Sequence, residues 1–270
     1  MNRIWIALFA LLLLPGIALS SARADDLGAD DLGADDLGDS ANAVMKKQAP
    51  AIVTIRMVID IEFGGQNRET RLQARGVAIS DSGLIMTALT TIKPNVNVRG
   101  PRGKNLEAKI TPADIKIVFE KDEKEHDAFV VVKDTKRGLA FLQIRDFNPE
   151  TRTIKWIDFA SSAKPVIGDQ VVTVTRLSKG FDYAPLFTVA RVIGKVKKPR
   201  KGHLIDKGGN VGLPVFNLDG KLLGIHARMK SGLREGLQRN SPGQPVLLSA
   251  KEVNGVIKQA MKKAAEGEPE

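Results

Sequence analysis

The sequence contains no cysteine, three histidines, one tyrosine and two tryptophans among its 270 residues. Without cysteine, disulfide bonds are excluded and stability must come from a hydrophobic core. Zinc sites built from cysteine and histidine are excluded as well, and because the three histidines are scattered we expect no metal site and no cofactor. With so few tyrosine and tryptophan rings there is no stacking platform for bases, so we do not expect nucleic acid as a partner.

The N-terminal apolar run, Ile4 to Leu14, is broken by Pro15-Gly16 and falls short of the roughly 20 residues that a membrane-spanning helix needs. Arg3 before this run and Ala22-Arg23-Ala24 after it are typical of a secretory signal peptide over residues 1–24. An uncleaved membrane anchor is the alternative. We therefore expect a secreted or periplasmic protein of a bacterial envelope, with no transmembrane helix once the signal is removed.

An Ala-Asp-Asp-Leu-Gly repeat follows, and residues 25–39 contain seven aspartates. Such a segment buries too little apolar surface to fold, so we expect a disordered spacer; shielding of the basic body or weak calcium binding is the alternative. A short helix is expected over Ser40 to Gln48. The formal net charge is +10, and without the two signal arginines and the seven aspartates the remainder carries +15. A domain with this positive charge attracts polyanions.

The densest positive cluster in the sequence is a candidate for a binding function. It comprises Lys195, Lys197, Lys198, Arg200 and Lys201. Two interpretations stay open: a solvated loop, or a surface for an anionic partner such as an envelope polysaccharide, an acidic lipid or an acidic protein segment.

Many short β-type runs, separated by Gly, Pro, Asn or Asp, fill the central part of the chain. They are Ile52–Ile61, Gly76–Ile79, Leu84–Met86, Ile115–Phe119, Ala128–Val132, Leu139–Ile144, Gln170–Thr175, Phe187–Ile193, Leu213–Phe216 and Leu222–His226. This pattern favours an all-β sandwich or barrel over an α/β sheet. Near the end, Ser249-Ala250-Lys251-Glu252 predicts a capping box. The helix that follows would bury Val253, Val256, Ile257, Ala260 and Met261.

Three segments resemble, in order, the motifs of trypsin-like serine proteases. The segment Gly209-Asn210-Val211-Gly212-Leu213-Pro214 resembles the Gly-Asn-Ser-Gly-Gly-Pro segment, with Val211 in place of the nucleophilic serine. The hairpin from Arg75 to Ile92 resembles the one that carries the catalytic histidine, and Thr90 falls at that position. The strand Gly138–Ile144 resembles the one that begins with the catalytic aspartate, and Gly138 replaces it.

The resemblance is to the HtrA-type envelope proteases, without their PDZ domains. It implies a trypsin-like double β-barrel with a C-terminal helix over residues 40–265, followed by a tail, 266–270. With Thr90, Gly138 and Val211 at the triad positions, no catalytic residue is expected. The expected function is that of an inactive homologue, a pseudoprotease, acting as a binding or scaffolding protein. An active serine endopeptidase with a displaced nucleophile is the alternative, and a purely electrostatic envelope protein is a third interpretation.

The resemblance also suggests where a ligand would bind. Gly209, Asn210 and Val211 form a vestigial oxyanion region that could still hold a carbonyl or carboxylate. Leu213 is expected to add bulk beside this pocket, where the family has glycine. His226 is expected beside the cleft, either in contact with a bound peptide or as a residue of the cleft rim. Ser80 and Ser82 fit a hairpin turn better than a rescued active site.

Overall fold

A computed structural model describes residues 32–63, 66–94, 98–99, 105–106, 109–120, 124–229 and 244–267. The chain separates into two units, residues 1–36 and residues 37–270. The expected signal peptide, the first part of the acidic repeat and the end of the tail lie outside the described residues. In the described part, no helix is long and apolar enough to span a membrane.

The first barrel is a closed antiparallel sheet of six strands in the order β1-β2-β3-β8-β7-β6. Its strands are β1 (Ile52–Phe63), β2 (Gln66–Ala78), β3 (Leu84–Ala88), β6 (Lys109–Phe119), β7 (His126–Asp134) and β8 (Leu139–Ile144). The short strands β4 (Val98–Arg99) and β5 (Asn105–Leu106) pair only with each other. Closure leaves no barrel strand with an unpaired edge.

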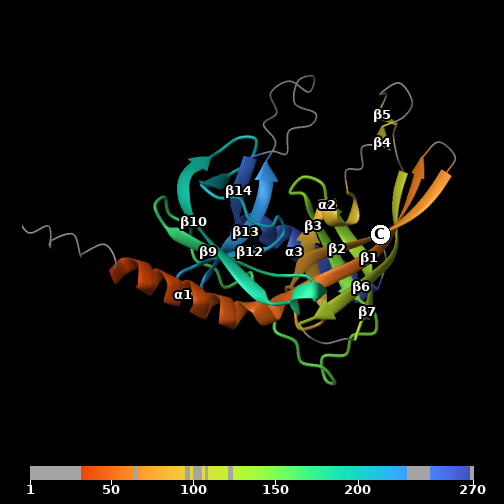
Figure 1. Ribbon diagram of the computed structural model, residues 1–270, viewed down its shortest axis with the longest axis horizontal. Helices are drawn as coiled ribbons and strands as arrows, with labels where there is room; N and C mark the ends of the chain where they lie inside the picture. The colour runs from red at the N-terminus through yellow and green to blue at the C-terminus, as the bar shows by residue number, and fades with distance from the viewer. Residues whose placement is uncertain are drawn as a thin grey trace, which may run out of the picture. The chain divides into compact units, whose positions relative to one another are not determined.

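The second barrel repeats this plan with the order β10-β11-β14-β13-β12-β9. Its strands are β9 (Gln170–Arg176), β10 (Pro185–Val196), β11 (Gly202–Ile205), β12 (Pro214–Asn217), β13 (Leu222–Met229) and β14 (Gln244–Ser249). In Figure 1 these strands lie on the left and the first barrel lies on the right. The predicted trypsin-like double β-barrel is confirmed.

The described residues form three buried apolar clusters. One lies within the first barrel and includes Ile55 and Ile117; another lies within the second and includes Val192 and Leu223. The largest cluster contains residues of both barrels, among them Phe141 and Phe216. It buries the junction at which the candidate site is built, so the two halves of that site are held by hydrophobic contact.

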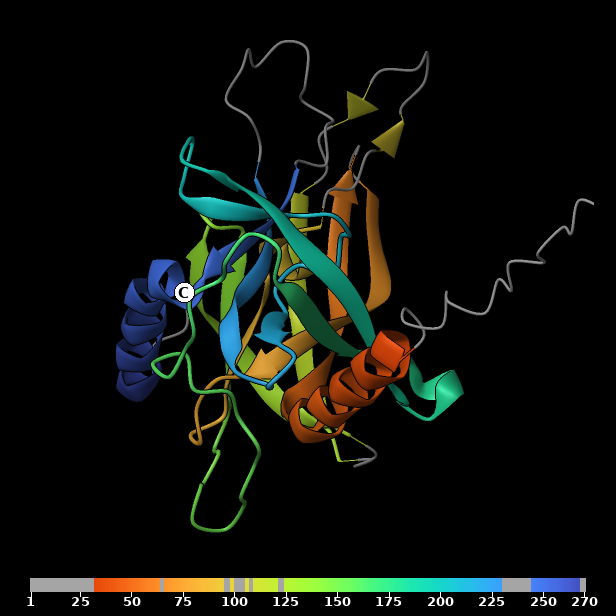
Figure 2. The same ribbon diagram turned by 90° about the vertical axis from the view of Figure 1, so that its left-hand side faces the viewer.

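The C-terminal helix α3 (Ala250–Glu266) packs on β7 of the first barrel and on β13 and β14 of the second (Figure 2). Four of the five predicted core residues are buried, whereas Met261 is 39% exposed, so its predicted burial is wrong. The predicted capping box is also wrong, because Ser249 makes no side-chain capping hydrogen bond. Ser249 is the last residue of β14, paired with Gly224, and the strand fixes its position instead.

Helix α1 (Leu32–Gln48) begins eight residues before the predicted start at Ser40. The prediction of a disordered spacer is therefore wrong for residues 32–39. Alanine and leucine favour helix, and Lys46 and Lys47 in the last turn complement the helix dipole. Ala41 and Val44 are buried in the largest apolar cluster, which anchors the second half of this helix.

Candidate functional site

Thr90 lies directly after strand β3, in the short helix α2 (Leu89–Ile92), and is exposed. The neighbouring Leu89 N–H donates a hydrogen bond of 2.8 Å to the carbonyl of Gly138. Gly138 is therefore next to the short helix that carries Thr90. Gly138 itself has a φ of +70°, and a Cβ added there would meet no atom within 4 Å.

Val211 belongs to the loop between β11 and β12, which packs against the end of β3. A Cβ added to Gly212 would lie 2.3 Å from the backbone nitrogen of Ala88, so only glycine allows this approach. The Gly212 N–H donates to the carbonyl of His226 at 2.8 Å, and His226 N–H donates to the carbonyl of Leu213 at 2.8 Å. These bonds fix the loop to β13 of its own barrel.

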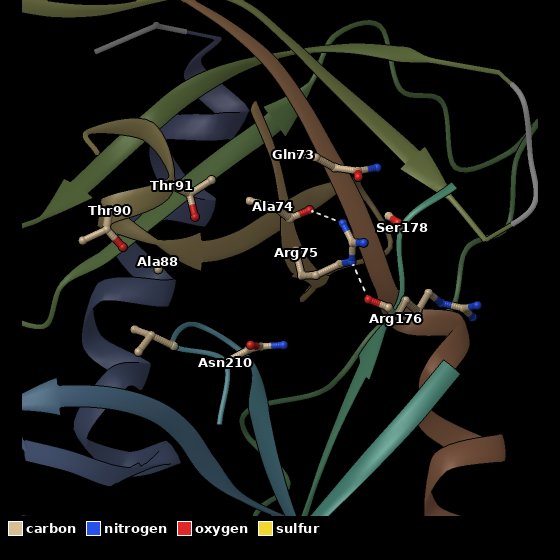
Figure 3. Close-up of a pocket in the computed structure, with 10 residues that line it drawn as sticks. Gln73, Ala74, Arg75, Ala88, Thr90, Thr91, Arg176, Ser178 and Asn210 are labelled. Atoms are coloured by element: carbon tan, nitrogen blue, oxygen red, sulfur yellow. Dashed lines mark hydrogen bonds between the residues drawn. The ribbon is translucent and has the colours of Figure 1, made fainter. Parts of the chain in front are cut away.

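A cleft of about 510 Å³ opens where the two barrels meet, a volume in the range of small-ligand sites. It is lined by Gln73, Ala74, Arg75, Ala88, Thr90, Thr91, Arg176, Ser178, Asn210 and Val211 (Figure 3). Thr90 and Val211 thus face one cavity although 121 positions separate them in the sequence numbering. Gly138 is not among the residues that line it.

His226 is not on the rim of this cleft. It is 2% exposed within the second barrel, and its Nε2 accepts a hydrogen bond of 2.8 Å from the Gly209 N–H. Burial lowers its pKa to about 4; the backbone of Lys207 opposes the shift, and the charge of Arg228 adds to it. The predicted contact with a bound peptide is therefore wrong: His226 is a neutral acceptor for the Gly209 amide.

This hydrogen bond bears on the vestigial oxyanion region. In trypsin-like proteases the oxyanion is held by the amides of the nucleophilic residue and of the residue two positions before it. In the register expected from the sequence, the corresponding amides are those of Val211 and Gly209, and the Gly209 N–H donates to His226. Asn210, between them, donates from Nδ2 to Thr175 Oγ1 at 2.8 Å. One of the two matching donors is therefore already engaged inside the fold.

Leu213 does not narrow the cleft. Its side chain is fully buried in the large apolar cluster between the barrels and does not belong to the cleft lining. The expected bulk beside the oxyanion region is wrong, because the alternation along the chain turns this side chain into the core.

Every histidine of the chain is described, and none lines the cleft. His126 begins β7, His203 lies on β11 and His226 is buried. Ser80 is also accounted for, since its Oγ accepts the Leu84 N–H at 3.1 Å in the β2–β3 turn. The residues that line the cleft include one serine, Ser178. They include no histidine, lysine, aspartate or glutamate.

The arrangement of barrels and cleft agrees with a comparison with known families. A model described as trypsin-like peptidase domain matches residues 74–225, more than half of the chain. The chain belongs to this trypsin-like peptidase family. The matched segment runs from β2 to β13, so it includes the stretches that contribute Thr90, Gly138 and Val211. No curated protein matches the chain.

Two arginines of the cleft were not found from the sequence. Arg176 is buried: its Nε and Nη2 donate to the carbonyl of Ala49 at 3.1 and 2.8 Å, and Nη2 pairs with Glu120 at 3.1 Å. Arg75 donates from Nε to the carbonyl of Arg176 at 2.8 Å. Burial lowers the pKa of both guanidinium groups. The cleft of this trypsin-like domain is therefore lined by two cationic side chains.

The basic cluster lies apart from these residues in the sequence, at the tip of the β10–β11 hairpin. Lys195, Lys197, Lys198 and Lys201 are exposed, and Arg200 is partly buried. The pKa of nearby His203 is lowered, first by burial and then by the positive charges of Lys195 and Lys164. Contact of this hairpin with a polyanion stays a prediction.

Proposed function

We propose that this protein is an exported, catalytically inactive trypsin-like homologue, of the HtrA type, that binds a peptide or protein in the cell envelope. The binding site is the cleft between the barrels. The observation that carries the proposal is that this cleft of about 510 Å³ is lined by Thr90 and Val211, and that its lining includes no histidine and no carboxylate.

The chemistry of peptide hydrolysis in this fold needs a nucleophile, a base and an oxyanion site. Val211 has no proton to lose and no lone pair to attack with, and the hydroxyl of Thr90 is a poor base near neutral pH. The Gly209 N–H donates to His226, so it is not free to stabilise an oxyanion. A cleft of this kind retains shape and donors for binding without a route to an acyl-enzyme.

The alternative, a peptidase with a displaced nucleophile, has three hydroxyls in the cleft, those of Thr90, Thr91 and Ser178, of which Ser178 is the one serine. Its hydroxyl would need a base within hydrogen-bond reach. The charged residues that share the cleft lining with it, Arg75 and Arg176, are cations that do not accept protons at neutral pH. The inactive interpretation is therefore favoured.

We expect the purified mature chain to react with neither a fluorophosphonate probe nor a casein substrate under conditions in which an active trypsin-like protease does both. The reason is the missing nucleophile and base. In-gel fluorescence and release of labelled casein fragments measure the two properties. The variant Ser178→Ala is the matched control: labelling that disappears in this variant would identify Ser178 as the nucleophile and contradict the proposal.

Export is a separate part of the proposal, supported by the apolar run and the Ala22-Arg23-Ala24 site. We expect the protein recovered from the periplasm of a bacterial host to begin at Asp25, as measured by intact mass. The variant Ala24→Arg should block cleavage. A full-length chain retained in the membrane fraction would instead support the anchor interpretation.

An anionic envelope component at the β10–β11 hairpin is a further proposed partner, supported by the exposed lysines and the lowered pKa of His203. Such binding should weaken steeply as salt is raised and should be indifferent to changes at Val211. Binding in the cleft should instead respond to Val211.

A further inference from the structure

The cleft carries positive charge that the fold does not balance. Arg75 and Arg176 line it, and none of the lining residues is acidic. Arg176 is paired with Glu120, whereas Arg75 donates its side-chain hydrogen bonds to backbone carbonyls: from Nε to Arg176 at 2.8 Å and from Nη1 to Ala74 at 2.9 Å. Over the described part of the chain, no carboxylate forms an ion pair with Arg75.

Arg75 is also partly removed from water. Its side chain is half-buried, and burial lowers its pKa; the Tyr183 hydroxyl opposes that shift and the charge of Arg176 adds to it. A guanidinium that is desolvated without a counter-charge is unfavourable for the free protein. A carboxylate entering the cleft would supply that counter-charge.

The guanidinium is held ready for such a contact. Its two bonds to backbone carbonyls fix the plane of the group, and within the described residues Nη2 has no partner, so its N–H groups remain for a ligand. In Figure 3 the Arg75 side chain lies between Arg176 and the turn of Thr90 and Thr91. A donor fixed in advance loses little conformational entropy on binding, which favours affinity.

The remaining lining groups suit an extended peptide. Gln73, Thr90, Thr91 and Ser178 supply neutral donors and acceptors, and Ala74, Ala88 and Val211 supply small apolar surface. A volume of about 510 Å³ accommodates several atoms beyond the carboxylate itself. The mixture fits peptide amides and short side chains around one acidic group.

We infer that the ligand of this cleft is a peptide segment that presents a carboxylate to Arg75. The carboxylate is that of an aspartate or glutamate side chain, or that of a C-terminus; both offer the same two oxygens to the guanidinium. The inference rests on the proposed peptide-binding function and adds the chemical class of its ligand.

The test is affinity selection of random hexapeptides on the immobilised mature chain, with the retained peptides identified by mass spectrometry. One pool has amidated C-termini and the other has free carboxylates, so the two sources of the carboxylate are distinguished. A parallel selection on Val211→Trp, which fills the cleft, identifies the peptides whose retention depends on it. In the amidated pool we expect the ratio of peptides with an acidic side chain to peptides without one to be at least about ten-fold higher among these peptides than in the input, since each charge-assisted pair is worth about that factor in affinity.

Variants then assign the preference to Arg75. Arg75→Gln should abolish the acidic preference, and Arg75→Lys, which keeps the charge but loses the fork, should reduce it. Because Arg75 also bonds to Arg176, a second variant leaves it in place: Thr90→Glu, at an exposed position, puts a fixed carboxylate into the cleft as a competitor. Arg68→Gln, an exposed arginine on the same strand β2, is the charge-matched control and should retain the preference.

Three results would count against these ideas, and they differ. An acidic preference that survives both Arg75→Gln and Thr90→Glu overturns the role of Arg75. Cleft-dependent peptides without any acidic preference overturn the inferred ligand class and leave the peptide-binding function standing. The absence of any cleft-dependent peptide overturns both.

Discussion

Replacing Gly212 by alanine should destabilise the fold by about 4 kcal/mol or more, a loss that single substitutions reach only through severe mechanisms. Gly212 has a φ of +89°, and an added Cβ would lie 2.3 Å from the Ala88 nitrogen and 2.7 Å from the Thr87 carbonyl carbon. Both atoms belong to the backbone of strand β3, so neither can turn aside as a side chain would. The substitution therefore pushes apart the two barrels at the point where the cleft is formed.

Gly138→Ala provides the matched control. Gly138 has a similar φ of +70°, but a Cβ there would meet nothing within 4 Å. This variant measures the cost of the left-handed conformation alone, about 1–2 kcal/mol. Urea unfolding of both variants and of the parent chain gives the two free energies of unfolding. Equal losses for the two substitutions would mean that the close approach at Ala88 contributes nothing to stability.

The fold was the part of the molecule that sequence patterns predicted best. Each predicted β-type run falls in a strand of the structure, with Gly76–Ile79 and Leu213–Phe216 extending by one residue beyond β2 and β12. The strands β11 and β14, without which the second barrel cannot close, were missed. Strand β11 has only four residues. Strand β14 includes Pro245, and a proline within an apolar run argues against a central strand.

The candidate site was predictable only where it depends on local motifs. The glycine-rich loop and the β2–β3 hairpin led to Val211 and Thr90, and the structure places both in one cleft. Their interpretation as positions of a lost triad stays a prediction. The pairing of Arg75 with the Arg176 carbonyl joins residues 101 positions apart, and no local pattern reports such a contact.

The position of His226 shows why burial was misjudged. Strand β13 is buried on both faces from Leu222 to Ala227, so polar and apolar residues do not alternate there. The prediction for His226 rested on the family resemblance, in which the strand before this position lines the wall of the cleft, and a buried histidine needs a specific partner. That partner is the Gly209 N–H, 17 positions earlier, and it becomes visible only in three dimensions.

The free energy of unfolding should therefore fall on acidification because of His226. Its pKa is lowered to about 4 in the folded protein, against about 6.5 in an unfolded chain. Above about pH 6.5 the imidazole is neutral in both states and the full stability is present. As the pH falls from about 6.5 to about 4, the unfolded state binds the proton first, and roughly 3 kcal/mol of stability is lost.

The physical event behind this loss is specific to the site. A proton on Nε2 removes the acceptor of the Gly209 N–H, so the loop that carries Val211 loses a hydrogen bond to β13. Peptide binding in the cleft should weaken over the same pH range if the loop moves. Amide hydrogen exchange at Gly209 reports this opening directly, since exchange requires the hydrogen bond to break.

The variant His226→Gln separates this histidine from the many carboxylates that also titrate in acid. Glutamine does not titrate, and its side-chain oxygen can accept the Gly209 N–H from a similar reach. Between pH 7 and pH 4.5 the parent chain should lose about 2 kcal/mol more than the variant in urea unfolding. Parallel losses in the two proteins would mean that His226 keeps an ordinary pKa in the fold. The Gly209 amide would then lack a neutral acceptor near pH 5, and the argument that this amide is withdrawn from the cleft would fail with it.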